Sequence, residues 1–135
     1  MYRYSFCYPL VAEIKEAGYT DPAGVLAALR GFPWVDCLRE MEGVPDRHLH
    51  FSPSVAFEHL TDIKGMAISI VGMPAAYGFY VSYKRHTSKR RLFNRLGIPV
   101  HPCVSNLEGQ RWEEVERLAA LMFARQYDVL EALFS

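Results

Sequence analysis

Hydrophobic and polar residues alternate with a period of two in three short segments, residues 54–60, 66–71 and 78–84. In the first of them Val55 and Phe57 alternate with Ala56 and Glu58. Successive side chains of a β-strand point to opposite faces, so each segment should have one covered face and one free face. The pattern predicts a three-stranded antiparallel meander, with a short polar loop at 61–65 and a longer, weakly polar loop at 72–78.

The free face of this meander is expected to carry mostly small side chains around one tyrosine. Its predicted members are Ala56, Glu58, Ala67, Ser69, Tyr80, Ser82 and Lys84. Such a face would provide a floor on which a partner can dock. The alternative is that a helix, or the segment 98–105, covers it.

Three segments in the first third of the chain have the punctuation of helices, with proline near the start and glycine just after the end. They are residues 9–17, 22–31 and 33–42, and Asp21 stands in position to cap the second. This asymmetry is typical of helices. Residues 2–8 are rich in aromatic side chains, which favour pleated surfaces, so an edge strand is an alternative there.

Apolar residues follow a period of 3.6 from Gln110 to Leu133, which predicts one long C-terminal helix. Ser105 and Glu108 have the spacing of a capping box before it. Residues 90–96 are compatible with one or two helical turns, and Pro99 and Pro102 exclude regular helix in 98–105. Together the patterns predict a single α+β domain over residues 1–135, with short N-terminal helices and the long C-terminal helix packed on the meander.

The charges of the chain cancel overall but are unevenly distributed. Fifteen basic and fifteen acidic side chains balance, yet residues 84–95 contain six basic residues and no acid. A neutral total disfavours a protein that binds nucleic acid without specificity. The three cysteines are widely spaced, which favours a reducing compartment. With no signal peptide and no apolar run of about 20 residues, a cytoplasmic location is expected, without membrane contact.

Candidate metal ligands occur in two pairs, His48 with His50 and His101 with Cys103. One residue separates the members of each pair, so on an extended backbone both side chains point the same way. Four such ligands are enough for a tetrahedral zinc site, although neither pair has standard zinc-ligand spacing. Glycine-rich phosphate loops are absent. We therefore assign no catalytic residue, metal or cofactor, and a metal-dependent enzyme is the third hypothesis.

The basic run that begins at Lys84 is the strongest polar signal, and two tyrosines adjoin it. Tyrosine and arginine are enriched at protein interface hot spots. The candidate partner-binding residues are Tyr80, Tyr83, Lys84, Arg85, Lys89, Arg90 and Arg91. The run could contact a protein, remain solvated, or bind nucleic acid through the 84–95 segment with the tyrosines as stacking groups.

From residue 32 onward the layout of the chain resembles the small cytoplasmic immunity proteins that bacteria encode beside polymorphic toxins. The similar elements are the start of a helix at 32–34, the strand at 53–57, the strand at 79–83 with its basic exit, and the closing helix ending at 127–133. The resemblance implies a stable, non-enzymatic protein that binds a cognate toxin and blocks its active site or substrate surface. This is the first hypothesis, and a small nucleic-acid-associated protein is the second.

The resemblance leaves open which surface would bind the toxin. The basic run suits a toxin with an acidic face. A second set of residues, all acidic, suits a basic cleft instead: Glu40, Glu42, Asp46, Glu58 and Asp62. In either case opposite charges would speed association and set specificity.

Overall fold

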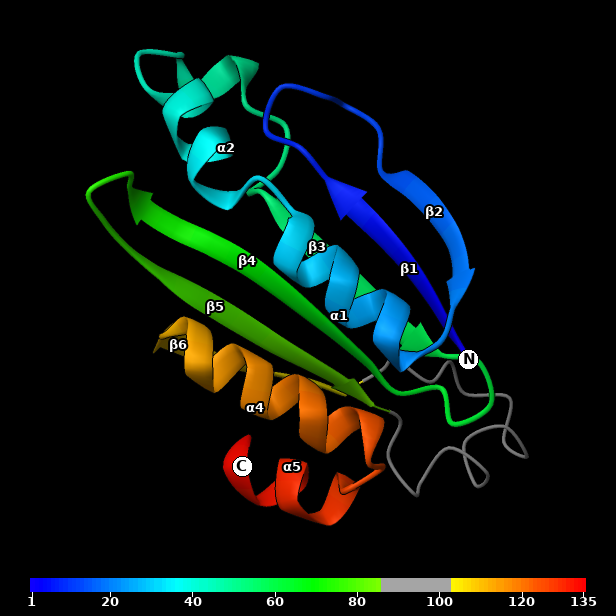
Figure 1. Cartoon of the computed structure of the whole chain (residues 1–135). Helices are drawn as coiled ribbons and strands as arrows, with labels where there is room; N and C mark the ends of the chain where they lie inside the picture. Colours follow the sequence, from blue (N-terminus) through cyan, green and yellow to red (C-terminus); the bar gives the residue numbers. More distant parts are fainter. Residues whose placement is uncertain (86–102) are drawn as a thin grey trace, which may run out of the picture.

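The computed structural model describes residues 1–85 and 103–135, which form a sheet with helices packed on it (Figure 1). The strands are β1 (Tyr2–Cys7), β2 (Lys15–Thr20), β3 (Ser54–His59), β4 (Gly65–Met73), β5 (Ala76–Arg85) and β6 (Cys103–Gln110). The helices are α1 (Pro22–Gly31), α2 (Trp34–Met41), α4 (Trp112–Phe123) and α5 (Tyr127–Leu133), with a short 3-10 helix, η1 (Asp46–His48). The predicted α+β class is confirmed.

The six strands form one antiparallel sheet in the order β2-β1-β3-β4-β5-β6. The predicted meander is the centre of this sheet, β3-β4-β5, but the expectation of only three strands was wrong. β1 joins it through pairing of Tyr4 with Phe57, and β6 joins through pairing of Val81 with Leu107. β2 pairs in turn with β1, so three strands are added to the meander, and local alternation does not indicate any of these pairings.

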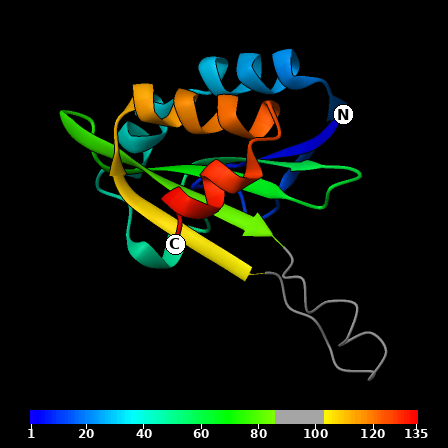
Figure 2. The same ribbon diagram turned by 90° about the horizontal axis from the view of Figure 1, so that it is seen from below.

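One face of the sheet is covered by helices, and the hydrophobic core lies between them. Figure 2 shows α1 and α4 side by side on the same side of the sheet. The core-facing residues of the central strands include Val55, Ile68 and Val81, all fully buried. Leu29 of α1 and Met122 of α4 pack against them in the same core. The apolar faces that the sequence predicted for the central strands therefore point towards the helices.

The N-terminal region contains two strands where a helix was expected over residues 9–17. Leu10 and Ile14, the stripe of that predicted helix, are 47% and 52% exposed. Gly18 is not a helix stop: it lies within β2, and its positive φ of 100° occurs at a bulge where the pairing with β1 shifts. The alternative of a strand at residues 2–8 is the correct one. The other two predicted helices are present as α1 and α2, and the Asp21 carboxylate caps α1 by accepting from the Gly24 backbone N at 2.8 Å.

The C-terminal region forms two helices, so the prediction of one long helix was wrong. α4 ends at Phe123, and Arg125 adopts a left-handed conformation with φ 56° before α5 starts. The chain turns back there, and Figure 1 shows α5 beside α4. Ser105 and Glu108 lie in β6 and form no capping box, because α4 begins only after Arg111. The predicted helical turns at 90–96 lie outside the described residues.

Both outermost strands of the sheet are interrupted by a bulge. In β2 the pairing shifts beside Gly18, and in β6 it shifts opposite Tyr80, next to Gly109 with φ 65°. A bulge of this kind inserts an extra residue and increases the local twist of the strand. Each edge of the sheet is therefore irregular along its length.

Within the described part of the chain, no helix is long and apolar enough to cross a membrane.

Candidate functional site

The face of the sheet opposite α1 and α4, called the open face below, carries small and polar side chains. At its centre Ala56, Ala67 and Ser82 lie next to one another on β3, β4 and β5. They line a hollow of about 260 Å³ whose rim includes Arg3 and Lys84. The small residues predicted for the free face of the meander are thus on one surface, and that surface is concave.

Three charged side chains lie together at the hollow. The Glu58 carboxylate is 3.6 Å from the Arg3 guanidinium and 3.7 Å from the Lys84 Nζ. Arg3 and Lys84 are 54% and 44% exposed, so these pairs contribute little to stability. Both cations are accessible to a partner that offers a better-placed acceptor. On the same face the Ser82 hydroxyl hydrogen-bonds the Asn106 Oδ1 at 2.8 Å.

The sheet divides the candidate partner-binding residues between its two faces. Tyr80 and Lys84 lie on the open face, next to Ser69 and Gly65 of β4. Tyr83 points the other way, is fully buried, and packs on the ring of Phe134 at 5.3 Å between centroids. Tyr83 is therefore a core residue and not part of an exposed patch.

Arg85 lies on the same side of the sheet as Tyr83. Its Nε is 2.6 Å from Glu131 Oε1, its guanidinium lies over the Tyr83 ring, and its side chain is 11% exposed. The reason for the division is the period of two itself, which turns neighbouring residues of a strand to opposite faces. Lys89, Arg90 and Arg91 lie outside the described residues.

The hydroxyl group of Tyr83 is buried without a hydrogen-bond partner among the described residues. Burial raises the pKa of Tyr83 to about 12. Because an unsatisfied buried hydroxyl is costly, we expect Tyr83→Phe to raise the free energy of unfolding by about 1 kcal/mol. Urea denaturation measures the free energy of unfolding. Tyr80→Phe on the open face is the matched control, and its free energy of unfolding should stay unchanged. A loss of stability in Tyr83→Phe would contradict the expectation.

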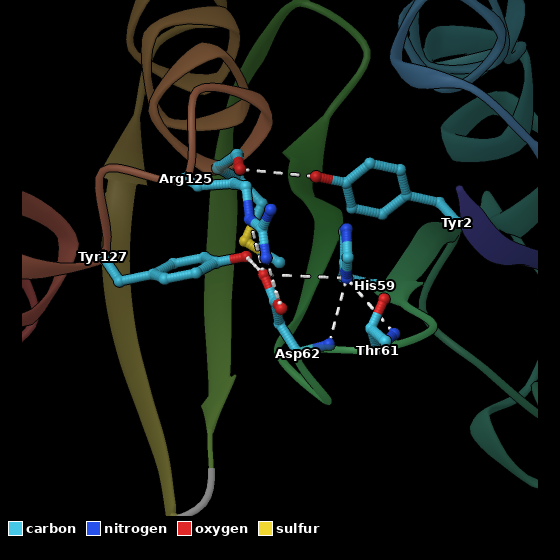
Figure 3. A network of polar contacts seen from close by, with 7 residues as sticks. Tyr2, His59, Thr61, Asp62, Arg125 and Tyr127 are labelled. Atoms are coloured by element: carbon cyan, nitrogen blue, oxygen red, sulfur yellow. Dashed lines mark hydrogen bonds and ion pairs between the residues drawn. The ribbon is translucent and has the colours of Figure 1, made fainter.

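A network of polar side chains joins the β3-β4 loop to the corner between α4 and α5 (Figure 3). The Asp62 carboxylate accepts hydrogen bonds from Arg125 Nε at 2.9 Å, from Arg125 Nη2 at 2.6 Å and from the Tyr127 hydroxyl. The Arg125 bonds, followed by the Tyr127 bond, hold the pKa of Asp62 below its usual value. Burial, followed by the Asp62 bond, raises the pKa of Tyr127. We call these three residues the Asp62 network.

His59 supports the loop that presents Asp62. Its Nδ1 accepts from the backbone N of Thr61 at 3.3 Å and of Asp62 at 3.0 Å. Nearby, the Tyr2 hydroxyl of β1 donates a hydrogen bond to the Met122 carbonyl of α4 at 3.3 Å. An acid, a histidine and two tyrosines lie close together here, a combination that also occurs in catalytic sites. In this protein their hydrogen bonds go to backbone groups and to one another, and so hold the loop and the helix corner in place. The arrangement fits a structural role.

The Asp62 network was not predicted from the sequence. Asp62 was placed among the acids available for a partner, but its side chain is 16% exposed and already paired. The network depends on the left-handed turns at Ile63 and Arg125, with φ of 52° and 56°. Neither residue type favours this conformation, so the sequence gives no local signal for either turn.

The candidate metal ligands are not brought together in the part of the chain that is described. His48 and His50 are exposed, in η1 and just after it. His101 and the side chain of Cys103 lie outside the description. Within residues 1–85 and 104–135, histidine, cysteine and acidic side chains form no group of three or more that could hold a metal ion. Cys37 is buried in the core, and this burial raises its pKa to about 11, which disfavours the reactive thiolate.

Comparison with known proteins finds no matching family model, no matching curated protein and no matching solved structure.

Proposed function

We propose that this protein is a non-enzymatic protein-binding module that neutralises a bacterial toxin by direct contact, as an immunity protein does. The observation that carries the proposal is the open face, with its hollow of about 260 Å³ between Arg3 and Lys84. Small side chains such as Ala56 and Ala67 allow a partner to approach the sheet closely. A partner with a projecting acidic group would match this hollow in shape and in charge.

The rim charges are suited to selecting a partner. Arg3 and Lys84 share the single carboxylate of Glu58, so neither cation has an acid of its own in this group. An acidic residue of a toxin that approaches the hollow would be attracted to both. Electrostatic attraction of this kind raises association rates and rejects partners of the wrong charge.

The nucleic-acid hypothesis is weaker because Arg85, one cation of the 84–95 segment, is engaged within the protein. Its Nε lies 2.6 Å from Glu131 Oε1, and its side chain is 11% exposed. Arg85 would have to release this carboxylate before it could neutralise a phosphate. If nucleic acid were the ligand, mobility of a short oligonucleotide would change at low salt and recover steeply as salt increases.

The proposal is tested by coexpressing the protein with the product of the neighbouring gene in its native host. We expect that product to be toxic alone, to be tolerated when coexpressed, and to copurify in a fixed ratio. A neighbouring gene that encodes no toxic protein, together with a pull-down that yields no stoichiometric partner, would refute the proposal.

Charge reversal of Lys89, Arg90 and Arg91 to glutamate is expected to weaken binding of the copurified toxin at least about tenfold, if the basic run attracts it. The unfolding temperature should stay unchanged. Isothermal titration calorimetry measures the affinity, with Arg47→Glu/Arg117→Glu as a control of two exposed cations elsewhere. Unchanged affinity in the triple variant would exclude Lys89, Arg90 and Arg91 as contacts and leave the open face or the acidic residues as candidates.

A further inference from the structure

The β4-β5 hairpin ends in an exposed apolar tip. Residues 65–83 contain no charged side chain. The hairpin extends past the neighbouring strands (Figure 1), and Val71, Met73 and Tyr77 at its end are 46%, 62% and 47% exposed. Exposed apolar side chains at a protruding end are candidate contact points. Tyr77 lies on the helix-covered side with Phe79, whereas Val71, next to the buried Ile70, faces the open side.

The tip has a fixed backbone shape. Gly72 has φ 120°, and a Cβ atom added there would lie 2.5 Å from the Ala76 carbonyl oxygen. Only glycine fits this close turn between the two strands. The apolar side chains at the end of the hairpin are therefore carried by closely paired strands that only glycine at position 72 allows.

A second hollow, of about 310 Å³, adjoins the tip and is walled mainly by aromatic rings. Its lining residues include Phe32, Trp34, Tyr77, Phe79 and Trp112. The ring centroids of Trp34 and Trp112 each lie 5.4 Å from that of Phe79. We call this hollow the aromatic pocket.

The aromatic pocket offers apolar surface and has no free indole donor. Trp34 Nε1 donates to the Leu29 carbonyl at 2.9 Å, and Trp112 Nε1 donates to Glu116 Oε1 at 3.0 Å. A polar ligand group that needs a donor from either indole would remain unpaired there. The pocket is thus suited to an apolar or aromatic side chain.

The two segments that supply the tryptophans are acidic. Residues 34–42 contain three acids and one base, and residues 108–116 contain four acids and one base, which gives these segments a net charge of −5. Asp36 lines the pocket itself, and its side chain is 70% exposed and lies 3.3 Å from Arg39. Arg30 pairs with Glu116 at 2.9 Å and offsets one of these acids. A partner with lysine or arginine beside its apolar side chain would complement this charge, and such cations also interact favourably with tryptophan faces.

We propose that the hairpin tip and the aromatic pocket form a second protein-binding site, whose partner inserts one apolar side chain flanked by lysine or arginine. The site lies at the hairpin end and on the helix-covered side of Phe79, apart from the hollow of the open face. It does not depend on the toxin-neutralising function proposed above.

Tryptophan fluorescence tests this site directly, because both tryptophans of the chain line the pocket. The probe is a nine-residue peptide with a central phenylalanine flanked by lysines. We expect a saturable change of emission that weakens as salt increases. The same peptide with glutamates for the lysines, or with serine for the phenylalanine, should bind at least about tenfold more weakly.

Variants locate the site. Tyr77→Ser should lower the affinity for the lysine peptide at least about tenfold. Asp36→Lys should lower this affinity and also reduce its dependence on salt. Tyr19→Ser is the matched control, because Tyr19 is a 66% exposed tyrosine of β2, far from the pocket in the sheet order. Circular dichroism confirms folding of each variant. No saturable change with the lysine peptide, or equal binding of the glutamate peptide, would overturn the proposal, whatever the outcome of the toxin coexpression.

Discussion

Replacing Ala67 by tryptophan is expected to weaken binding of the proposed toxin partner at least about a hundredfold, a loss of about 2.7 kcal/mol of binding free energy. Ala67 lies at the centre of the open face, between Ala56 and Ser82, and lines the hollow. An indole there would occupy the space that a docked partner needs. Isothermal titration calorimetry with the copurified toxin measures the effect.

The same substitution should leave the fold intact, because the Ala67 side chain points away from the core. We expect the free energy of unfolding to change by no more than about 0.5 kcal/mol, as is usual for surface substitutions. Ala120→Trp, at an exposed position of α4 on the covered side of the sheet, is the matched control and should bind normally. Normal binding by Ala67→Trp would show that the toxin contacts another surface, such as the hairpin tip.

Asp62→Ala is expected to lower the free energy of unfolding by about 2 kcal/mol. The substitution removes the acceptor for Arg125 and for the Tyr127 hydroxyl, which is partly buried. It also separates the β3-β4 loop from the α4-α5 corner. Urea denaturation measures the loss, with Asp46→Ala as the control because Asp46 is exposed and lies in η1. Equal stabilities of the two variants would contradict a structural role for the network.

The contribution of Asp62 should also depend on pH. Its pKa is lowered in the folded protein, mainly by the hydrogen bonds from Arg125. The stabilisation is therefore present above the unfolded-state pKa of about 3.9 and is lost as the pH falls through the lower folded-state value. The difference in unfolding free energy between wild type and Asp62→Asn should shrink below about pH 4. A difference that stays constant from pH 7 to pH 3 would contradict this account.

The centre of the sheet could be predicted from the sequence because its signal is local. Val55, Ile68 and Val81 alternate with small or polar residues, and all three are fully buried in the core. The free face was predicted on the same grounds, and Ala56, Ala67 and Ser82 lie on it side by side. Where one face of a strand is buried, the period of two specifies its orientation.

The edges of the sheet and the end of the chain could not be predicted in the same way. β1 is held by pairing with β3, about 50 residues away, so its placement depends on contacts that a local pattern does not contain. The apolar periodicity of residues 110–133 continues across the break between α4 and α5, because both helices contribute to one core. The turn at Arg125 is stabilised by Asp62, which lies 63 residues earlier in the chain.

The candidate site was predicted as a stretch of sequence, whereas surfaces on a sheet are made of alternate residues. Tyr80 and Lys84 lie on the open face, while Tyr83 and Arg85 lie on the covered one. The partners of Lys84 on its own face come from other strands: Arg3 from β1 and Glu58 from β3. A site of this kind becomes visible only when the strand order is known.

The bulges in β2 and β6 determine how this protein can associate with others. A regular edge strand offers a row of backbone donors and acceptors to any extended chain, and so invites growth of the sheet into fibres. The positive φ of Gly18 and Gly109 interrupts that row at each end of the sheet. Self-association by adding strands is thereby discouraged, even though residues 65–83 include an uncharged, strongly strand-forming segment. The irregular edges therefore leave the faces of the sheet, and not its edge strands, as the surfaces for contact with other proteins.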